Sequence, residues 1–146
     1  MNLKTIYMST VRSVLEYSSN TYHSQINMGQ INLIERAQKH CLKMIYGYNH
    51  TYEKLLEMSQ LTTMEQRRQK LFDKFTKKTL ENVTYKKWFP LKENVRETRK
   101  PRPYIEEHAN SGRLYRSPLF AMRRLLNDEP PVTADPDDTS GAHNAP

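Results

Sequence analysis

The chain has 146 residues, 36% of them hydrophobic, and a formal net charge of +7, with 13 basic against 5 acidic residues over positions 61–102. This length suffices for about one domain with a buried core, and the concentrated basic excess favours an anionic partner such as nucleic acid. The single cysteine excludes an internal disulfide, and no stretch approaches the ~20 apolar residues of a membrane span, so we expect an intracellular protein, cytoplasmic or nuclear, without a membrane partner.

Apolar residues recur at three- and four-residue steps in the first fifty positions and predict two helices. The first covers about 2–17, and the turn formers that follow it end the helix. The second covers about 28–46 and is closed by Gly47, because glycine suits the conformation that is common at a helix C-terminus. We expect the two helices to lie antiparallel as neighbours.

Two further helices are predicted between residues 51 and 82. Thr51 can begin a short helix, since its hydroxyl can accept a hydrogen bond from an otherwise unpaired backbone N–H. Thr62 and Glu65 have the spacing of a capping box, which predicts the start of a long helix that reaches about Asn82. The apolar face expected for this helix consists of Met64, Arg68, Leu71, Phe72, Phe75 and Thr79.

The last third of the chain changes composition twice. Prolines and basic residues over 85–116 predict an extended basic connection, because proline disfavours helix. Ser117 and Pro118 predict the start of a short helix over 117–127. The acidic residues 128–146 have almost nothing apolar to bury and predict a disordered tail. We therefore expect an all-α protein in which residues 1–84 form a small bundle of three main helices plus short helices.

No arrangement of residues predicts catalysis. Asp135, Asp137 and Asp138 lie in the tail, where nothing orders them for metal-ion chemistry. The five histidines show none of the spacings that zinc-binding helices use. Cys41 lies on a predicted core face, which is inaccessible for a nucleophile. We predict that the chain is not an enzyme and has neither a metal nor a cofactor.

Aromatic and basic residues alternate after residue 84. The aromatic members are Tyr85, Trp88, Phe89 and Tyr104, and they lie among seven lysines and arginines. This mixture can stack nucleic-acid bases and neutralise phosphates. It can equally hold a long loop on the bundle while the charges stay in water, and the residues alone leave both interpretations open.

Four phrases of the sequence carry a resemblance. VRSVLEYSSNTYH is similar to Arg-Pro-x-Leu-Glu-Tyr followed by Trp-His, with Ser13 for proline and Tyr22 for tryptophan. IERAQKHCLKMIYG is similar to Leu-Glu-Arg-x-Gln-Lys-x-x-Leu-Lys-x-Ile-x-Gly. LTTMEQRR resembles Leu-x-Thr-Leu-x-x-Arg-Arg, and SPLFAMRRLLN resembles a closing phrase that ends in asparagine. In this order they resemble the segment after the polymerase palm in reverse transcriptases of non-LTR retrotransposons, in particular jockey-like mobile elements.

The resemblance covers about 3–127 and implies a helical thumb, which grips a primer–template duplex through its backbone. It also implies that the catalytic aspartates lie upstream, in the palm, so that this chain is a non-catalytic fragment of an RNA-directed DNA polymerase. The implied partner is RNA or an RNA–DNA duplex, bound without sequence readout. The candidate phosphate contacts are Arg36, Lys39, Lys43, Arg67, Lys70, Lys74, Lys77, Lys78, Lys86, Lys87, Arg99, Lys100 and Arg102.

Other residues of the same region are expected to be structural. Arg68 lies on the apolar face and is predicted to pair with a glutamate, and the candidates are Glu16, Glu35 and Glu57. The side chains predicted to pack are Tyr17, Tyr22, Phe72 and Phe75.

Two alternatives to nucleic-acid binding remain open. The first is a helical protein-interaction module, whose apolar docking surface would consist of Phe72, Phe75, Trp88 and Phe89. The second is a transposon remnant without function. Exposed apolar residues on the helix 2–17 are also expected to permit self-association.

Overall fold

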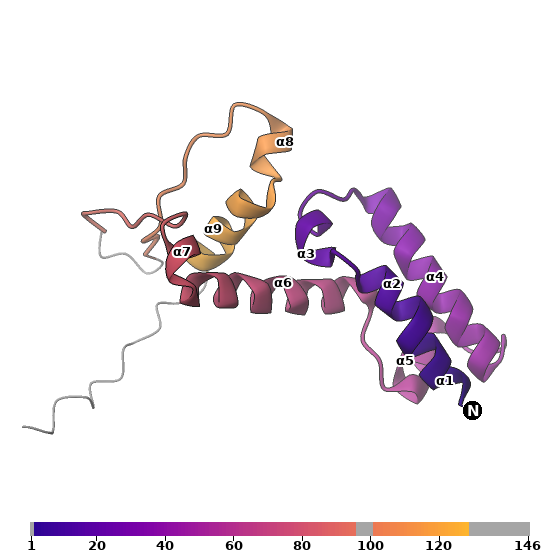
Figure 1. Ribbon diagram of the computed structural model, residues 1–146. Coiled ribbons are helices and arrows are strands. Elements are labelled where there is room, and N and C mark those ends of the chain that lie inside the picture. The colour runs from indigo at the N-terminus through magenta and orange to yellow at the C-terminus, as the bar shows by residue number, and fades with distance from the viewer. Residues whose placement is uncertain (1, 96–100, 129–146) are drawn as a thin grey trace, which may run out of the picture.

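The structure is a computed structural model that describes residues 2–95 and 101–128, and these residues form an all-α fold (Figure 1). The long helix α6, Met64–Glu81, joins two groups of helices (Figure 1). The group at its N-terminal end comprises α1 (Leu3–Ile6), the π-helical segment η1 (Tyr7–Arg12), α2 (Ser13–Glu16), α3 (Ser19–Tyr22), α4 (Met28–Tyr46) and α5 (Tyr52–Ser59). The other group comprises α7 (Val83–Lys86), α8 (Gly112–Tyr115) and α9 (Pro118–Asp128). The predicted disordered tail after Asp128 lies outside the described residues.

The first predicted helix is continuous from Leu3 to Glu16, but its middle turn is π-helical. The hydroxyl of Ser13 donates to the backbone carbonyls of Ser9 and Thr10, at 2.6 and 3.0 Å, and such bonds compete with regular helix geometry. The wider turn changes which residues face inward, so Arg12 is buried while Val14 is 72% exposed. Periodicity calculated for a regular helix therefore misplaces part of the buried face.

Tyr17 does not pack, contrary to the prediction, and is 79% exposed. The backbone leaves the helix at this residue, with a ψ of 130°, and Ser18 then takes a left-handed conformation with a φ of 54°. Tyr22, in the short helix that follows, is half-buried, and its hydroxyl donates to the carbonyl of Leu15 at 2.6 Å. Tyr22 thus bonds to the end of the first helix, while Tyr17 is exposed to solvent.

A buried polar network holds the first group of helices on the start of α6. Gln38 of α4 is fully buried and accepts a hydrogen bond from the hydroxyl of Tyr7 at 2.9 Å. Its amide donates to the hydroxyl of Tyr52 and to the carbonyl of Thr62, both at 3.0 Å. The hydroxyl of Tyr52 in turn donates to Glu35. Four separate segments therefore meet in one network around a single glutamine.

Helix α4 begins and ends where the sequence pattern predicts. Asn27 and Gln30 form a reciprocal capping box at its start, with both bonds at 2.9 Å. Gly47 follows the last helical residue with a φ of 103°, a conformation that strains any residue with a Cβ.

The start of α6 differs by one residue from the prediction. Thr63, and not Thr62, is the N-cap, and its hydroxyl accepts from the backbone N–H of Gln66 at 3.2 Å. The predicted capping box of Thr62 with Glu65 is therefore wrong. Glu35 of α4 also accepts the N–H of Met64, at 3.0 and 3.2 Å to its two oxygens. A residue distant in the sequence thus satisfies a donor that local capping leaves unpaired.

We expect Thr63→Ala to lower the free energy of unfolding by about 1 kcal/mol, because it removes the side-chain cap of α6. Thr62→Ala is the matched control and should change stability by less than about 0.5 kcal/mol, since Gln38 bonds to its backbone carbonyl and not to its side chain. Urea denaturation of both variants measures the difference. A larger loss for Thr62→Ala would restore the predicted capping box.

The second group of helices packs on the middle and end of α6. Phe72 of α6, Phe89 and Met122 of α9 form its buried core, with Leu80 and Tyr104 among the half-buried residues around them. Phe75 does not pack as predicted and is 39% exposed, whereas Thr76 is fully buried. The contacts of α6 with α3, α4, α7 and α9 determine which of its residues are buried.

The segment 85–116 is fixed on the core at several points. Leu91 and Tyr104 form an isolated antiparallel bridge, and α8 lies near the end of the segment. Asn127 of α9 is buried and bonds to both backbone groups of Tyr104, at 3.0 and 3.2 Å. Arg123 donates to the carbonyl of Trp88 at 3.1 and 2.8 Å. The last helix therefore holds the connection at Trp88 and at Tyr104, with side chains that bond to its backbone.

Candidate nucleic-acid interface

The exposed face of α6 carries four of the predicted phosphate contacts. They are Lys70, Lys74, Lys77 and Lys78, and all four are exposed. With Asp73 and Glu81 they line an open hollow of about 520 Å³. At 3.6 residues per turn, Lys70 and Lys74 lie roughly opposite the buried Phe72. The packing of α6 thus turns this lysine face, as we call these four residues, into solvent.

Repulsion between its own charges makes the lysine face suited to an anion. Lys70, Lys74 and Lys78 follow one another at four-residue steps, and like charges at this spacing oppose each other by ~0.2–0.5 kcal/mol per pair. Asp73 and Glu81 offset only part of the positive charge. The row from Lys70 to Lys78 extends ~12 Å along the helix. An extended polyanion along this row would relieve the repulsion.

Two aromatic rings and two lysines follow α6 in the chain, and all four side chains are exposed. Lys86 and Lys87 are exposed, and the rings of Tyr85 and Trp88 lie 4.8 Å apart, tilted by 43°, with both rings exposed. Phe89, in contrast, is buried edge-on against Tyr104, with ring centroids 6.4 Å apart. The aromatic residues of this segment therefore divide into an exposed pair, Tyr85 and Trp88, and a pair that packs in the core, Phe89 and Tyr104.

The remaining candidates do not gather on this surface. Arg36 and Lys39 are exposed on α4, which lies at the opposite end of α6 from α7 (Figure 1), and Lys43 is half-buried there. The Lys39 ammonium lies 5.9 Å from the centre of the Tyr52 ring. Arg102 is exposed beside the antiparallel bridge, where its carbonyl accepts from Lys92 at 2.9 Å. Arg99 and Lys100 lie outside the described residues.

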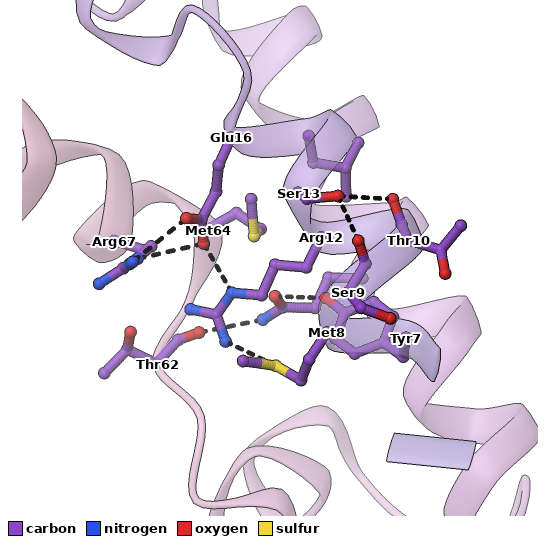
Figure 2. Close-up of polar contacts among 12 residues, drawn as sticks. Tyr7, Met8, Ser9, Thr10, Arg12, Ser13, Glu16, Thr62, Met64 and Arg67 are labelled. Carbon is purple, nitrogen blue, oxygen red and sulfur yellow. Dashed lines mark hydrogen bonds and ion pairs between the residues drawn. The ribbon is translucent and has the colours of Figure 1, made fainter. Parts of the chain in front are cut away.

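Arg67 has a different environment from the one predicted. Its Nε and Nη2 donate to the two carboxylate oxygens of Glu16, at 3.1 and 3.2 Å (Figure 2). Arg12 donates to the same carboxylate from its own Nε, at 2.7 Å (Figure 2). The two arginines and the glutamate thus join the first helix to α6, and Nε and Nη2 of Arg67 are both used in this contact.

Arg68 is buried, but none of the three predicted glutamates pairs with it. Glu16 pairs with Arg67, Glu35 caps α6, and Glu57 pairs with Lys54 at 3.2 Å. The Nε and Nη1 atoms of Arg68 are buried without a hydrogen-bond partner in the described part of the chain. Neighbouring residues on a helix point ~100° apart. The glutamate therefore pairs with Arg67, whereas the adjacent Arg68 points into the interior.

Glu16, His23 and Tyr7 have altered pKa values. Burial alone would raise the pKa of Glu16, but hydrogen bonds from Arg67 and Arg12 outweigh it and lower that pKa, which keeps the carboxylate ionised. Burial lowers the pKa of His23, whose Nε2 lies 2.9 Å from Oε1 of Gln69 and whose ring lies 5.1 Å from that of Phe72. For Tyr7, burial instead raises the pKa to about 12. Glu16 and His23 therefore have separate partners and do not form an acid–base pair.

The sequence interpretation missed the buried polar residues that position these surfaces. Gln38 and Arg12 are the clearest cases in the first group, and Asn127 in the second. Gln38 had a detectable signal, because it occupies an apolar position in the periodic pattern of its helix. No such signal marks Arg12, since the π-helical turn is what directs it inward.

The residues 2–95 and 101–128 contain neither a cluster of metal-binding side chains nor a helix that could span a membrane. Within these ranges no three histidine, cysteine, aspartate or glutamate side chains gather to hold a metal ion. Nor does any helix there have the length and apolar character needed to cross a bilayer. The chain matches no protein-family model, no curated protein and no solved structure.

Proposed function

We propose that this chain is a non-catalytic, thumb-like fragment of a non-LTR retrotransposon reverse transcriptase, and that it binds RNA or an RNA–DNA duplex in the cytoplasm or nucleus. The lysine face of α6 carries the proposal, because packing on the opposite side leaves it in solvent as a continuous row. Lys86, Lys87 and the Tyr85–Trp88 pair extend it with further charge and a stacking surface.

The chemistry of this surface favours binding without sequence readout. Lysine ammonium groups act on phosphates as point charges, and they gain affinity when the duplex releases its condensed counterions. Base-specific recognition needs side chains that reach base edges in a groove, usually in pairs of hydrogen bonds. The lysine face offers charge in a row, which suits the regular backbone of a duplex.

Neutralising one row of the lysine face tests the proposal. We expect Lys70→Gln, Lys74→Gln and Lys78→Gln together to weaken binding to a short RNA–DNA duplex by about tenfold to 100-fold, since each lysine contributes up to ~1 kcal/mol. The dependence of log affinity on log salt concentration should lose about 2 to 3 from its slope. Fluorescence anisotropy across a salt series measures both quantities.

The control is a triple variant with the same change of charge elsewhere. Lys54→Gln, Arg113→Gln and Arg116→Gln alter three exposed side chains that belong to none of the predicted contacts. This variant should keep the slope of the unmodified protein within about 1. Salt-independent binding of the unmodified protein, or no binding at about 50 mM salt, would contradict the proposal.

A protein-interaction surface on this chain would have to differ from the predicted one. The apolar docking surface expected from Phe72, Phe75, Trp88 and Phe89 does not form, because Phe72 and Phe89 are buried in the core. The first helix, however, exposes Val11, Val14 and Tyr17 together. These residues favour self-association through the helix 2–17, which sedimentation of the protein without nucleic acid would detect as a concentration-dependent mass.

A further inference from the structure

A second hollow lies between the first helix and the start of α6. It measures about 410 Å³ and is lined by Met8, Arg12, Ser13 and Glu16 from the first helix and by Arg67 from α6. Figure 2 shows both guanidinium groups meeting at the Glu16 carboxylate. None of its lining residues belongs to the lysine face, so this arginine hollow is a separate site.

The charges of the arginine hollow do not balance. Two guanidinium groups share one carboxylate, and the arginine at the base of the hollow, Arg12, has only 7% of its side chain exposed. Hydrogen bonds from both arginines keep the pKa of Glu16 low despite its burial, so the site carries one net positive charge. An arginine withdrawn from water in this way costs free energy unless an anion compensates it.

Several arginine donors remain available for such an anion. Nη1 of Arg12 donates only to the sulfur of Met8, at 3.5 Å, and a thioether is a weak acceptor. Nη2 of Arg12 and Nη1 of Arg67 make no hydrogen bond to any described residue. Neither atom is fully buried. These donors belong to residues of two different helices, and both residues line the same hollow.

We propose that the arginine hollow binds a phosphate group, with Arg12 and Arg67 as its anchors and Ser13 at its rim. Guanidinium forks match the oxygens of phosphate and give shorter, stronger bonds than neutral donors do. Donors from two arginines approach from different directions, which suits a tetrahedral phosphate better than a planar carboxylate. The site stands independently of duplex binding by α6, and its phosphate belongs either to a small phosphate monoester or to a nucleic-acid backbone.

Titration of the full chain with inorganic phosphate tests the site directly. We expect saturable shifts of the arginine Nε–Hε signals of Arg12 and Arg67 in NMR spectra. Ser13→Glu places a competing carboxylate at the rim and should weaken phosphate binding at least about tenfold, because it adds a like charge beside the bound anion. Ser9→Glu is the matched control: it makes the same change of charge one turn earlier on an exposed residue outside the hollow, and it should bind phosphate as the parent does.

A third variant is expected to strengthen phosphate binding. Glu16→Gln removes the carboxylate that competes for both arginines, so phosphate should bind more tightly, by about tenfold. This variant keeps the test decisive should Ser13→Glu fail to fold. Absence of saturable shifts in the parent, or equal weakening by Ser9→Glu and Ser13→Glu, would overturn the site.

The same variants identify the source of the phosphate. If the site takes a backbone phosphate, Ser13→Glu weakens binding of the RNA–DNA duplex more than Ser9→Glu does. If it takes a small monoester, Ser13→Glu weakens a nucleoside monophosphate and leaves the duplex unaffected. The triple lysine variant of α6 should bind inorganic phosphate like the parent, so a failure of the duplex proposal is distinguishable from a failure of this one.

Discussion

Phe72→Ala is expected to lower the free energy of unfolding by about 3–5 kcal/mol, the range typical of a phenylalanine removed from a packed core. Phe72 is 2% exposed and forms a core cluster with Phe89 and Met122. Its ring also lies 5.1 Å from the ring of His23, which belongs to the first group of helices. A cavity at this position therefore weakens the packing of both groups on α6. Chemical denaturation followed by Trp88 fluorescence measures the loss.

Phe75→Ala is the matched control for this variant. It deletes the same side chain from the same helix, less than one turn further on, but Phe75 is 39% exposed. We expect a loss of less than about 1 kcal/mol, as for most partly exposed positions. Similar losses for the two variants would mean that Phe72 and Phe75 both pack in the core, as the sequence pattern predicted, and that the packing described above is wrong.

Gln38→Leu should also be strongly destabilising, by about 3 kcal/mol, although leucine is apolar and similar in size. The substitution removes the acceptor of the Tyr7 hydroxyl and both donors that bond to Tyr52 and Thr62. A buried polar group left without a partner costs ~1–3 kcal/mol, and Tyr7 and the Thr62 carbonyl are both affected. Equilibrium denaturation with urea measures the change.

Two controls separate the polar network from a general effect of the substitution. Gln66→Leu makes the same replacement at an exposed position of α6 and should change stability by no more than about 0.5 kcal/mol. Tyr7→Phe removes the hydroxyl that donates a hydrogen bond to Gln38. The double variant Tyr7→Phe with Gln38→Leu should therefore lose less free energy of unfolding than the sum of the two single losses. Additive losses would show that the two side chains do not interact.

The position of the candidate interface was partly accessible from sequence. A concentration of lysines on one predicted helix is a local property, and the opposite apolar residues show which side of that helix faces the core. The sequence could not show that the α4 candidates lie at the other end of α6 from Lys86 and Lys87 (Figure 1). That separation depends on how α4 packs with α5 and α6, which involves residues distant in the chain.

Adjacent residues with similar chemistry mark the limit of the sequence interpretation. Arg67 and Arg68 can each pair with a glutamate, and Thr62 and Thr63 can each cap a helix. The structure selects Arg67 for Glu16 and Thr63 for the cap. Because consecutive side chains on a helix point ~100° apart, a small rotation of α6 decides between them, and that rotation is set by its contacts with the other helices.

The sequence by itself determined the all-α class and the extent of the long helices. Helix α4 follows from its apolar periodicity and from Gly47 at its end, because hydrogen bonds four residues apart and local caps act within one segment. Only the tertiary structure decided the buried Gln38 network and the arginine hollow. Each of these depends on side chains from separate segments competing for the same donors and the same space, which no local pattern records.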